Sequence, residues 1–271
     1  MRIKDLSNRN QYVVAMSYDG AHFFGVQEQR GLITVMGEIR RRLEKAANQK
    51  VKALFCAART DRGVSAECNI ATFYFSESID DSDLLTNIVE SNDNRLAIGW
   101  LKRVSAHVHA RGNAREKYYR YTITDGCDNE QGQGWVIHPV LDAEKMALAA
   151  RSLVGEHDFK SFRGGGCQAS NTTKTIFSIE VKRNRPGQVL IDIVGNAFLR
   201  KMVRNIVGLL VEIGSGLRPV EDVAHVIQAG HRDAAGICAP PQGLCLIKVA
   251  FNAENAINFP CNYALINNIK I

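Results

Sequence analysis

The sequence lacks any apolar run of the length that a membrane-spanning helix needs, which is about 20 residues. Its longest apolar stretch, Ile206–Ile213, is interrupted by Gly208 and Glu212. The first residues, MRIKDLSNRNQ, also lack the apolar segment of a secretory signal peptide. We therefore expect a protein without a membrane segment that resides in the cytoplasm.

The seven cysteines lack the pairing that a disulfide framework or a structural zinc site requires. Their number is odd, and no two of them form a C-x-x-C motif. Tandem repeats and low-complexity linkers are absent from the sequence as well. The sequence therefore predicts reduced, mostly buried thiols, and it gives no indication of a bound metal.

What the sequence does have is the composition of an ordinary folded protein. Hydrophobic residues make up 45% of its 271 residues and charged residues 23%, which excludes general disorder. This length allows two modest domains or one large one. The 34 Lys and Arg residues exceed the 28 Asp and Glu residues and give a net charge of +6. This mild excess permits a polyanionic partner such as a nucleic acid without requiring one.

The hydrophobic pattern alternates short strands with helices, and strands often follow one another directly. This order favours an α+β fold with mostly antiparallel sheets over a doubly wound parallel sheet. We place a domain boundary near residue 110, which gives an N-terminal α+β domain (1–110) and a C-terminal α+β domain (111–271). The expected strands are Tyr12–Tyr18, Val51–Ala57, Ile70–Phe75, Leu96–Val104, Tyr118–Thr124, Ile176–Lys182, Gln188–Val194 and Leu244–Phe251. The expected helices run from Thr34 to about Asn48, over Asp81–Glu90, from Asp142, over Ala197–Ile213 and from Pro219 to Gly230.

An aspartate between two arginines stands at the expected end of a strand. The segment Cys56–Ala66 runs from small and apolar residues into Arg59, Asp61 and Arg62, and Gly63 allows a sharp turn there. Flanking guanidinium groups favour the charged form of a carboxylate, which could then serve as a nucleophile or a general base. An aspartate that is only salt-bridged within a turn is the commoner arrangement for such a pattern.

Positive side chains gather on the helix that we expect over Ala197–Ile213. Arg200 and Arg204 are four residues apart and should share one helix face, and Lys201 lies on the same helix. Such a cationic face could bind a carboxylate or phosphates. The alternative is a solvated face without a ligand.

Basic and aromatic residues interleave over Arg111–Tyr121 (RGNAREKYYRY). On a strand, Tyr119 and Tyr121 would point to one face while Tyr118 and Arg120 point to the other. Basic groups can hold a nucleic-acid backbone while aromatic rings stack on its bases. A strand that packs one tyrosine face into the core explains the pattern equally well.

Taken in order, these segments resemble the tRNA pseudouridine synthase A family from about Tyr12 to Phe251. Several blocks match, and blocks in register are far more specific than any one of them alone. The matching blocks are Tyr18–Gln27 (YDG…FGVQ), Arg59–Val64 (RTDRGV), His109–Arg111 with Tyr119–Tyr121, Gly155–Phe162 (GEHDFKSF), Asn196–Gly208 (NAFLRKMVRNIVG) and Ala239–Leu246 (APPQGLCL).

The resemblance implies an isomerase that converts uridine to pseudouridine in the anticodon stem-loop of tRNA, around positions 38 to 40. It implies neither a cofactor nor a metal. It also implies a homodimer, and a chain of two ferredoxin-like (RRM-like) halves with mostly antiparallel sheets joined around a central basic RNA-binding cleft. The expected partners are therefore tRNA and a second copy of the chain.

The resemblance also implies roles for individual residues. Asp61 matches the essential aspartate, which acts at C1′ as a nucleophile or as a base that leads to a glycal intermediate. Arg204 matches the arginine that pairs with this aspartate, Tyr119 the tyrosine that stacks on the target uracil, and Arg59 the arginine that helps extrude the base. The further residues expected to bind substrate are Gln27, Arg62, Arg111, Lys117, Arg163, Arg200 and Lys201.

Several positions depart from the family pattern. The replaced residues are Val26 (usually Trp), Met36 (Gln), Arg62 (Ala), Ser65 (His) and Cys245 (Tyr), and Asn92–Leu96 stands in place of the NxLPxDI block. The catalytic core is kept while the frame around it has changed. This leaves two alternatives to a typical synthase: a catalytically silent RNA-binding protein or tRNA chaperone of the same fold, and a synthase whose RNA target has shifted.

Overall fold

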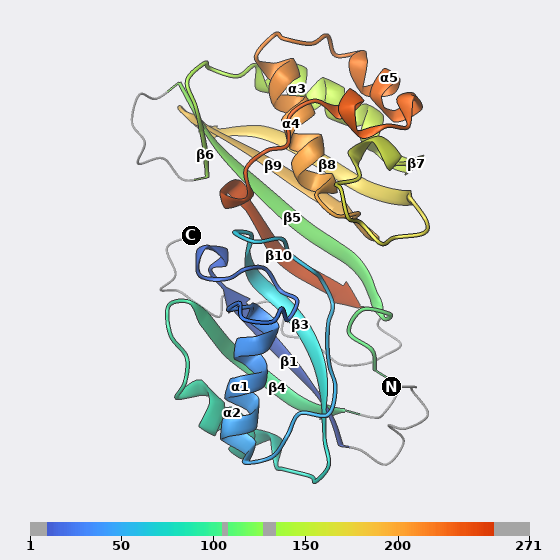
Figure 1. Cartoon of the computed structure of the whole chain (residues 1–271). Helices are drawn as coiled ribbons and strands as arrows, with labels where there is room; N and C mark the ends of the chain where they lie inside the picture. The colour runs from blue at the N-terminus through green and yellow to red at the C-terminus, as the bar shows by residue number, and fades with distance from the viewer. Residues whose placement is uncertain (1–9, 105–107, 127–133, 252–271) are drawn as a thin grey trace. The chain divides into compact units, whose positions relative to one another are not determined.

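The computed structural model describes residues 10–104, 108–126 and 134–251, and the chain forms two compact units (Figure 1). Of the described residues, the first unit contains 10–104, 108–115 and 246–251, and the second contains 116–126 and 134–245. The fold combines helices and strands in both units and is α+β, as the sequence predicted. The sequence placed one boundary near residue 110, whereas the chain passes from the first unit to the second after Arg115 and returns after Cys245.

Five strands form the sheet of the first unit. They are β1 (Asn10–Tyr18), β2 (Leu54–Cys56), β3 (Ser65–Phe75), β4 (Leu96–Val104) and β10 (Leu244–Phe251), whose first two residues belong to the second unit. The strand order is β4-β1-β3, and both β2 and β10 pair with β3. β1 runs antiparallel to β3 and β4, so that Ala15 lies opposite Ile70 on one side and Trp100 on the other. β2 is likewise antiparallel to β3.

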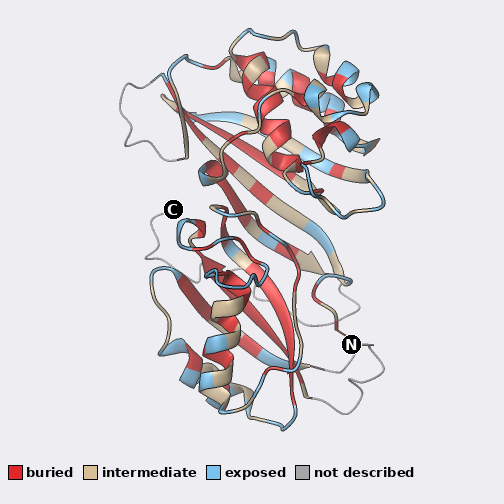
Figure 2. Ribbon diagram, viewed as in Figure 1, coloured by how far each residue is buried: buried red, intermediate tan, exposed pale blue. Residues whose placement is uncertain are grey.

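The centre of this sheet is buried on both faces. Every residue of β1 from Gln11 to Tyr18 is buried, and the same holds for β3 from Asn69 to Phe75 (Figure 2). Within this core, Tyr12 stacks on Phe73 with ring centroids 5.4 Å apart. A strand covered on both faces has a continuous apolar sequence, which is why YVVAMSY predicts a buried strand.

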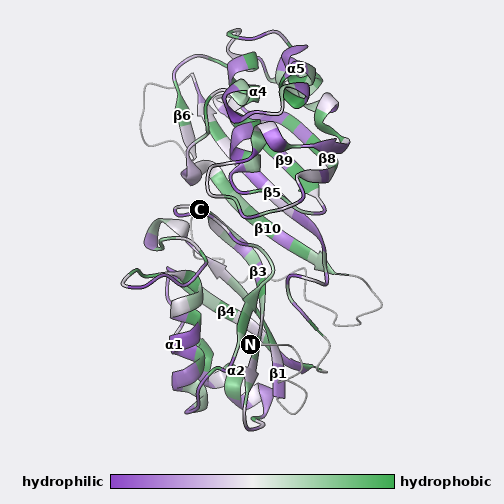
Figure 3. Cartoon of the chain, turned by 45° about the vertical axis from the view of Figure 1, so that its right-hand side comes forward, coloured by the Kyte–Doolittle hydropathy of each residue, from purple (hydrophilic) through white to green (hydrophobic). Residues whose placement is uncertain are grey.

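Two helices pack side by side on one face of this sheet (Figure 1). They are α1 (Val35–Ala47) and α2 (Asp81–Val89). The Thr34 hydroxyl accepts a hydrogen bond from the Gly37 N–H at 3.2 Å and caps α1, as predicted. The predicted apolar stripe of Val35, Ile39 and Leu43 is buried. Both hydrophilic and hydrophobic residues lie along α1, and its apolar residues recur at the helical spacing of an amphipathic helix (Figure 3).

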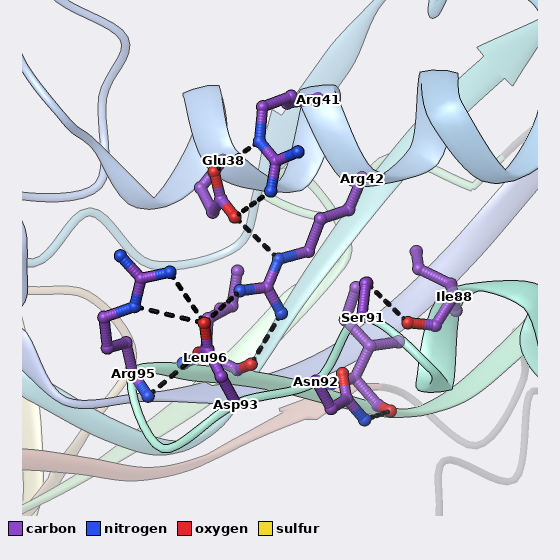
Figure 4. A network of polar contacts seen from close by, with 10 residues as sticks. Glu38, Arg41, Arg42, Ile88, Ser91, Asn92, Asp93, Arg95 and Leu96 are labelled. Atoms are coloured by element: carbon purple, nitrogen blue, oxygen red, sulfur yellow. Dashed lines mark hydrogen bonds and ion pairs between the residues drawn. The ribbon is translucent and has the colours of Figure 1, made fainter.

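One arginine of α1 lies inside the first unit (Figure 4). The side chain of Arg42 is 1% exposed, and it forms ion pairs with Glu38 at 2.8 Å and with Asp93 at 3.0 Å. Arg42 also donates to the Leu96 carbonyl at 2.8 Å, and Arg95 forms an ion pair with Asp93 at 2.7 Å. These bonds join α1 to the turn between α2 and β4, the segment that departs from the NxLPxDI pattern.

The sheet of the second unit has the strand order β5-β9-β8-β7. Its strands are β5 (Ala114–Asp125), β6 (Trp135–Ile137), β7 (Gly155–Asp158), β8 (Thr173–Arg185) and β9 (Gln188–Gly195). Neighbouring strands in this order run antiparallel, whereas β6 runs parallel to β5. The predicted hairpin of β8 and β9 turns at Gly187, whose φ is 73°. β6 and β7 were not predicted, because strands of three and four residues are too short to show a periodic pattern.

Three helices belong to the second unit, and α3 packs against both β8 and α4. They are α3 (Ala143–Ala150), α4 (Met202–Gly214) and α5 (Asp222–Ala229). The Asp142 side chain caps α3 by accepting from the Lys145 N–H at 2.9 Å, as predicted. The prediction that the strongest helix begins at Ala197 was wrong. It begins at Met202, because Lys201 has a left-handed φ of 61° that cannot continue a right-handed helix.

Short 3₁₀ helices complete the two units. They are η2 (Gly20–His22), η3 (Arg151–Leu153), η4 (Lys160–Phe162), η5 (Arg232–Ala235) and η6 (Pro241–Gly243). The predicted end of α5 is confirmed, since Gly230 follows it with a φ of 66°. Within the described ranges, no helix has both the length and the apolar character that crossing a membrane requires.

Candidate functional site

Asp61 begins a tight turn between β2 and β3, the aspartate turn Asp61–Val64. The Val64 N–H donates to the Asp61 carbonyl at 3.2 Å, and Gly63 has a φ of 80°, as the third position of a type II turn requires. Asp61 is half-buried, whereas Arg59 and Arg62 are exposed. The turn therefore presents a partly exposed carboxylate whose neighbours in the chain are cations.

A buried hydrogen-bond network holds the residues that lead into Asp61. The Tyr18 and Thr60 hydroxyl oxygens lie 3.0 Å apart. Asn69 donates to the Tyr18 hydroxyl at 3.1 Å and to the Ala58 carbonyl at 2.9 Å. All of these residues are buried, and satisfied polar groups in such a place fix one geometry. The backbone before Asp61 is thus tied to β1 and β3.

Asn69 was not among the predicted site residues, although the sequence carries a signal for it. It is the polar member at the start of the buried run Asn69–Phe75 (NIATFYF). A buried amide in such a run needs hydrogen-bond partners, because leaving its polar atoms unpaired is costly. Its position opposite the residues before Asp61 therefore marks it as a positioning residue.

The Tyr18-Asp19-Gly20 block packs directly against the aspartate turn. The Gly20 N–H donates to Ser65 Oγ at 3.0 Å. A Cβ atom at Gly20 would overlap the backbone of Val64, so only glycine allows this close approach. Ser65, one of the departures from the family pattern, therefore helps to join these two sequence blocks.

Positive charge gathers near the aspartate turn. Partial burial, together with the charge of Arg111, lowers the pKa of Arg59, so these two guanidinium groups lie close enough to repel each other. Both residues are exposed, and so is Gln27 in the loop before α1. Val26, in contrast, is buried, and its N–H donates to the Thr60 carbonyl at 3.2 Å.

Tyr119 and Tyr121 of β5 face the interior of the second unit, as the strand period predicted. Tyr119 is 6% exposed and meets Phe198 edge to face, with ring centroids 5.3 Å apart. The Tyr121 hydroxyl donates to the Pro240 carbonyl at 2.7 Å, and burial raises the pKa of Tyr121. Tyr121 therefore has a structural role in the second unit.

The opposite face of β5 carries an ion pair. Arg120 donates to the two carboxylate oxygens of Asp192 at 2.7 and 2.9 Å and to the Tyr118 hydroxyl at 2.9 Å. The hydrogen bonds to Asp192 raise the pKa of Arg120. Lys117 is half-buried near the start of the strand, with its Nζ 3.5 Å from the Asn196 carbonyl oxygen. Arg120 and Tyr118, which are part of the basic and aromatic pattern on this strand, therefore stabilise the fold of the second unit.

Arg204 joins α4 to the segment Ala239–Leu246. Its Nε donates to the Ala239 carbonyl at 2.7 Å, and the Ala239 N–H donates to the Arg204 carbonyl at 3.1 Å. The next residue, Asn205, is buried and donates to the Phe162 carbonyl at 2.7 Å. Three of the sequence blocks thus meet at the beginning of α4.

Arg163 and Arg200 both bind the loop that follows η4. Arg163 donates to the Cys167 carbonyl, and Arg200 Nη1 donates to the Gly165 carbonyl at 2.8 Å. The Gly164 N–H in turn donates to the Arg200 carbonyl at 2.8 Å. These bonds bring two of the predicted substrate-binding arginines to one loop of the second unit.

The prediction that Arg200 and Arg204 share one helix face was wrong. Arg200 precedes α4, and Lys201 turns the chain through a left-handed conformation before the first helical residue, Met202. Arg200 therefore reaches the loop after η4, whereas Arg204 reaches Ala239.

Comparison with known proteins assigns these blocks to one family. The family model described as tRNA pseudouridine synthase matches residues 149–252. A tRNA pseudouridine synthase A of Coxiella burnetii (strain Dugway 5J108-111) is 36% identical over 256 residues, which cover 93% of this chain and 94% of the relative. The protein of that name from Psychromonas ingrahamii is 38% identical over 245 residues, which cover 89% and 93%. The chain belongs to the tRNA pseudouridine synthase A family.

The solved structures that match show only a distant likeness, which carries no part of the tRNA pseudouridine synthase A assignment. A crystal structure of a Cbf5-Nop10-Gar1 complex matches with a TM-score of 0.37 and 12% identity, over 92% of this chain and 51% of that chain. The family assignment rests instead on sequence identity over nearly the whole chain.

The residues that the tRNA pseudouridine synthase A pattern marks as catalytic are divided between the two units. Asp61 and Arg59 lie in the first unit, and Tyr119 and Arg204 lie in the second. The pairing of Asp61 with Arg204 and the stacking of Tyr119 on a base therefore stay predictions. In the described part of the chain, no three His, Cys, Asp or Glu side chains are grouped so that they could hold a metal ion.

Proposed function

We propose that this chain is a tRNA pseudouridine synthase that converts uridine to pseudouridine in the anticodon stem-loop, around positions 38 to 40. The observation that carries the proposal is the aspartate turn. It holds a partly exposed carboxylate between Arg59 and Arg62, on a backbone that Asn69 fixes from inside the unit. Membership of the tRNA pseudouridine synthase A family supplies the reaction and the RNA class.

The proposed reaction is an isomerisation in which every atom of the substrate is retained or exchanged with water. The bond between C1′ and uracil N1 breaks, the freed base turns, and a bond forms between C1′ and C5. The hydrogen on C5 leaves to solvent, and N1 gains a proton. Asp61 acts at C1′ as the nucleophile, or as a base that leads to a glycal intermediate. The reaction needs no external oxidant, reductant or group donor.

Three further residues complete the proposed site. Arg204 pairs with Asp61 and orients it, Tyr119 stacks on the target uracil, and Arg59 enters the space that the extruded base leaves. Extrusion costs a few kcal/mol, which an inserted guanidinium offsets in part. The remaining proposed substrate-binding residues are Gln27, Arg62, Arg111, Lys117, Arg163, Arg200 and Lys201.

We also propose that the two units are ferredoxin-like halves around a basic RNA-binding cleft, in a homodimer that works in the cytoplasm. The first unit supports the fold part of this proposal. Its chain order β1-α1-β2-β3-α2-β4 and its sheet order β4-β1-β3, with β2 on β3, correspond to a βαββαβ arrangement. Light scattering after size-exclusion chromatography tests the dimer, and a monomeric mass would contradict it.

The function is tested by tritium release from a tRNA transcript labelled at C5 of uridine. We expect release by the wild-type protein and none by Asp61→Ala or Asp61→Asn, since neither side chain can act as nucleophile or base. Asp83→Ala, which removes an exposed carboxylate from α2, is the matched control and should keep full activity. Full release by Asp61→Ala would overturn the assignment. Mapping pseudouridine in the product RNA then tests the proposed positions.

The alternative is a catalytically silent RNA-binding protein. Arg62 and Val26 motivate it, because each changes polarity or bulk near the expected site. Val26 and Met36, another departure from the family pattern, are buried. Their N–H groups donate to the Thr60 carbonyl at 3.2 Å and to the Val26 carbonyl at 3.0 Å. Val26 and Met36 therefore lie in the packing next to the aspartate turn and not at its partly exposed carboxylate, which favours the enzyme. Binding of tRNA by the wild-type protein without tritium release would favour the alternative.

A further inference from the structure

Arg62 makes a contact that the sequence did not predict. Its guanidinium carbon lies over the Phe24 ring, 4.2 Å from the ring centroid, which is within the range of a cation–π contact. Phe24 is 37% exposed, and Arg62 is exposed as well. In the part of the chain that the structure describes, Arg62 takes part in no hydrogen bond and no ion pair.

The loop that carries Phe24 is fastened to the aspartate turn. The Phe24 N–H donates to the Ile33 carbonyl at 2.8 Å, and its carbonyl accepts from Gln29 Nε2 at 2.9 Å. The next residue, Gly25, has a φ of 89°, and a Cβ there would lie 3.2 Å from the Thr60 carbonyl oxygen. The ring is therefore held in place on the same backbone junction that holds Asp61.

A guanidinium that lies over a ring uses one face for this contact and keeps its N–H edge for other partners. That planar edge matches two oxygens of a phosphate. The ring also restricts the arginine before binding, so less side-chain freedom is lost when a ligand binds. A phosphate that approaches Asp61 is repelled by the carboxylate, and an adjacent cation offsets this repulsion.

We infer that Arg62 and Phe24 form a phosphate-binding platform, on which Arg62 binds a backbone phosphate of the RNA next to the target uridine. The inference rests on the proposed function for the identity of the RNA. Because Ala is common at this position in the family pattern, the platform is a contact that this chain adds. It raises the affinity for the substrate and leaves the rate of the chemical step unchanged.

The test compares Arg62→Ala, Arg62→Lys and Phe24→Leu with Arg103→Ala, which removes an exposed arginine from β4 as a control. Binding of tRNA is measured by fluorescence anisotropy at several KCl concentrations, and turnover by tritium release. Arg62→Ala should raise Kd and KM roughly tenfold and leave kcat within about twofold. It should also reduce the slope of log K against log salt concentration by about 1. Arg103→Ala should match the wild type in each measurement.

The other two variants separate the charge from the platform. Arg62→Lys keeps the positive charge without the planar edge, so the salt slope should stay while Kd rises. Phe24→Leu removes the ring but keeps an apolar side chain, and Kd should again rise without a change in slope. In the Arg62→Ala background, Phe24→Leu should have no further effect, because the guanidinium that the ring holds is already gone.

Three results would overturn the inference. They are an unchanged salt slope in Arg62→Ala, a fall in kcat without a change in Kd, and additive effects of Phe24→Leu and Arg62→Ala. Circular dichroism tests whether each variant is folded. Binding is measured without turnover. A wild-type protein that binds tRNA and releases no tritium would therefore contradict the proposed function but not the inference about Arg62. The salt slopes would still decide the role of Arg62.

Discussion

Asn69 supports the backbone before Asp61 from inside the first unit. It donates to the Ala58 carbonyl and accepts from the Ala58 N–H at 3.3 Å. Asn69→Ala leaves this buried N–H without a partner, and an unsatisfied buried group costs about 1–3 kcal/mol. We expect the free energy of unfolding in urea to fall by about 2 kcal/mol or more. We also expect kcat to fall with little change in KM, because the aspartate turn loses its support.

Asn94→Ala is the matched control for this prediction. Asn94 is exposed in the turn before β4 of the same unit, and surface substitutions of this kind change stability by less than about 0.5 kcal/mol. If Asn69→Ala unfolded at the same urea concentration as Asn94→Ala, Asn69 would not be a support of the turn.

Cysteine reactivity should differ between Cys167 and Cys56. Burial raises the pKa of the Cys56 thiol to about 12. Burial acts in the same direction on Cys167, but backbone hydrogen bonds at Ala169 and Arg200 and the charge of Arg163 together lower the pKa of its thiol. Since the thiolate is the reactive form, we expect iodoacetamide at neutral pH to modify Cys167 well before Cys56, as read by peptide mass spectrometry. Equal rates at the two cysteines would contradict this.

At the scale of elements, the sequence predicts the helices and strands whose own residues show a long periodic pattern. β4 occupies the predicted range Leu96–Val104, and β10 occupies the predicted range Leu244–Phe251. The start of α4 could not be predicted in this way, because Lys201 is an ordinary helix former whose left-handed conformation comes from its surroundings. The Gly164 N–H, for example, binds the carbonyl of the preceding residue, Arg200.

The candidate site shows the same division between local pattern and tertiary contact. The position of Asp61 at a turn follows from Gly63 and from the end of an apolar strand. The contact of Arg62 with Phe24 does not, because the two residues are far apart in the sequence. Their approach depends on the hydrogen bond from Val26 to Thr60, which only the folded chain makes.

The carboxylates that hold α1 should make the first unit sensitive to acid. Hydrogen bonding to Arg41, and further to Arg42, outweighs the effect of burial and lowers the pKa of Glu38 from 4.5 to about 2. The folded-state pKa lies below the ordinary value. The contribution of Glu38 to stability is therefore present above pH 4.5 and is lost as the pH falls toward about 2.

We expect the free energy of unfolding to fall over this pH interval. In Glu38→Gln the fall should be smaller than in the wild type. Asp93 contributes to the fall as well, since its bonds with Arg95 and the charge of Arg42 outweigh burial and lower its pKa. Glu90→Gln removes an exposed carboxylate from the end of α2 and serves as the control. Urea unfolding at a series of pH values measures the effect. An identical fall in the wild type and in Glu38→Gln would mean that other groups titrate.

At the scale of the whole molecule, the net charge of +6 conceals how the cations are placed. Each unit presents its own proposed substrate-binding cations. Those in the first unit are Arg62 and Arg111, beside the proposed catalytic Arg59, and those in the second are Lys117, Arg163, Arg200 and Lys201. Acidic residues elsewhere, such as Glu38 and Asp192, are used in ion pairs within a unit. A weak overall charge is therefore compatible with a strong local field for RNA.

The proposed pairing of Asp61 with Arg204 predicts an energetic coupling between the two units. If the side chains form an ion pair, each single substitution already removes it, so the double variant loses less stability than the sum of the single variants. We expect a coupling energy of about 0.5–3 kcal/mol between Asp61→Asn and Arg204→Gln. It is measured from free energies of unfolding in urea. This measurement needs no turnover, so the loss of activity in Asp61→Asn does not affect it.

Arg232→Gln supplies the control cycle. Arg232 also lies in the second unit, where it donates to the Gly236 carbonyl at 2.8 Å, and it has no part in the proposed site. Its cycle with Asp61→Asn should be additive to within about 0.5 kcal/mol. If the cycle with Arg204→Gln were additive to the same degree, Asp61 and Arg204 would not be paired in the free protein. The carboxylate would then be oriented by the first unit alone, through Thr60 and Asn69.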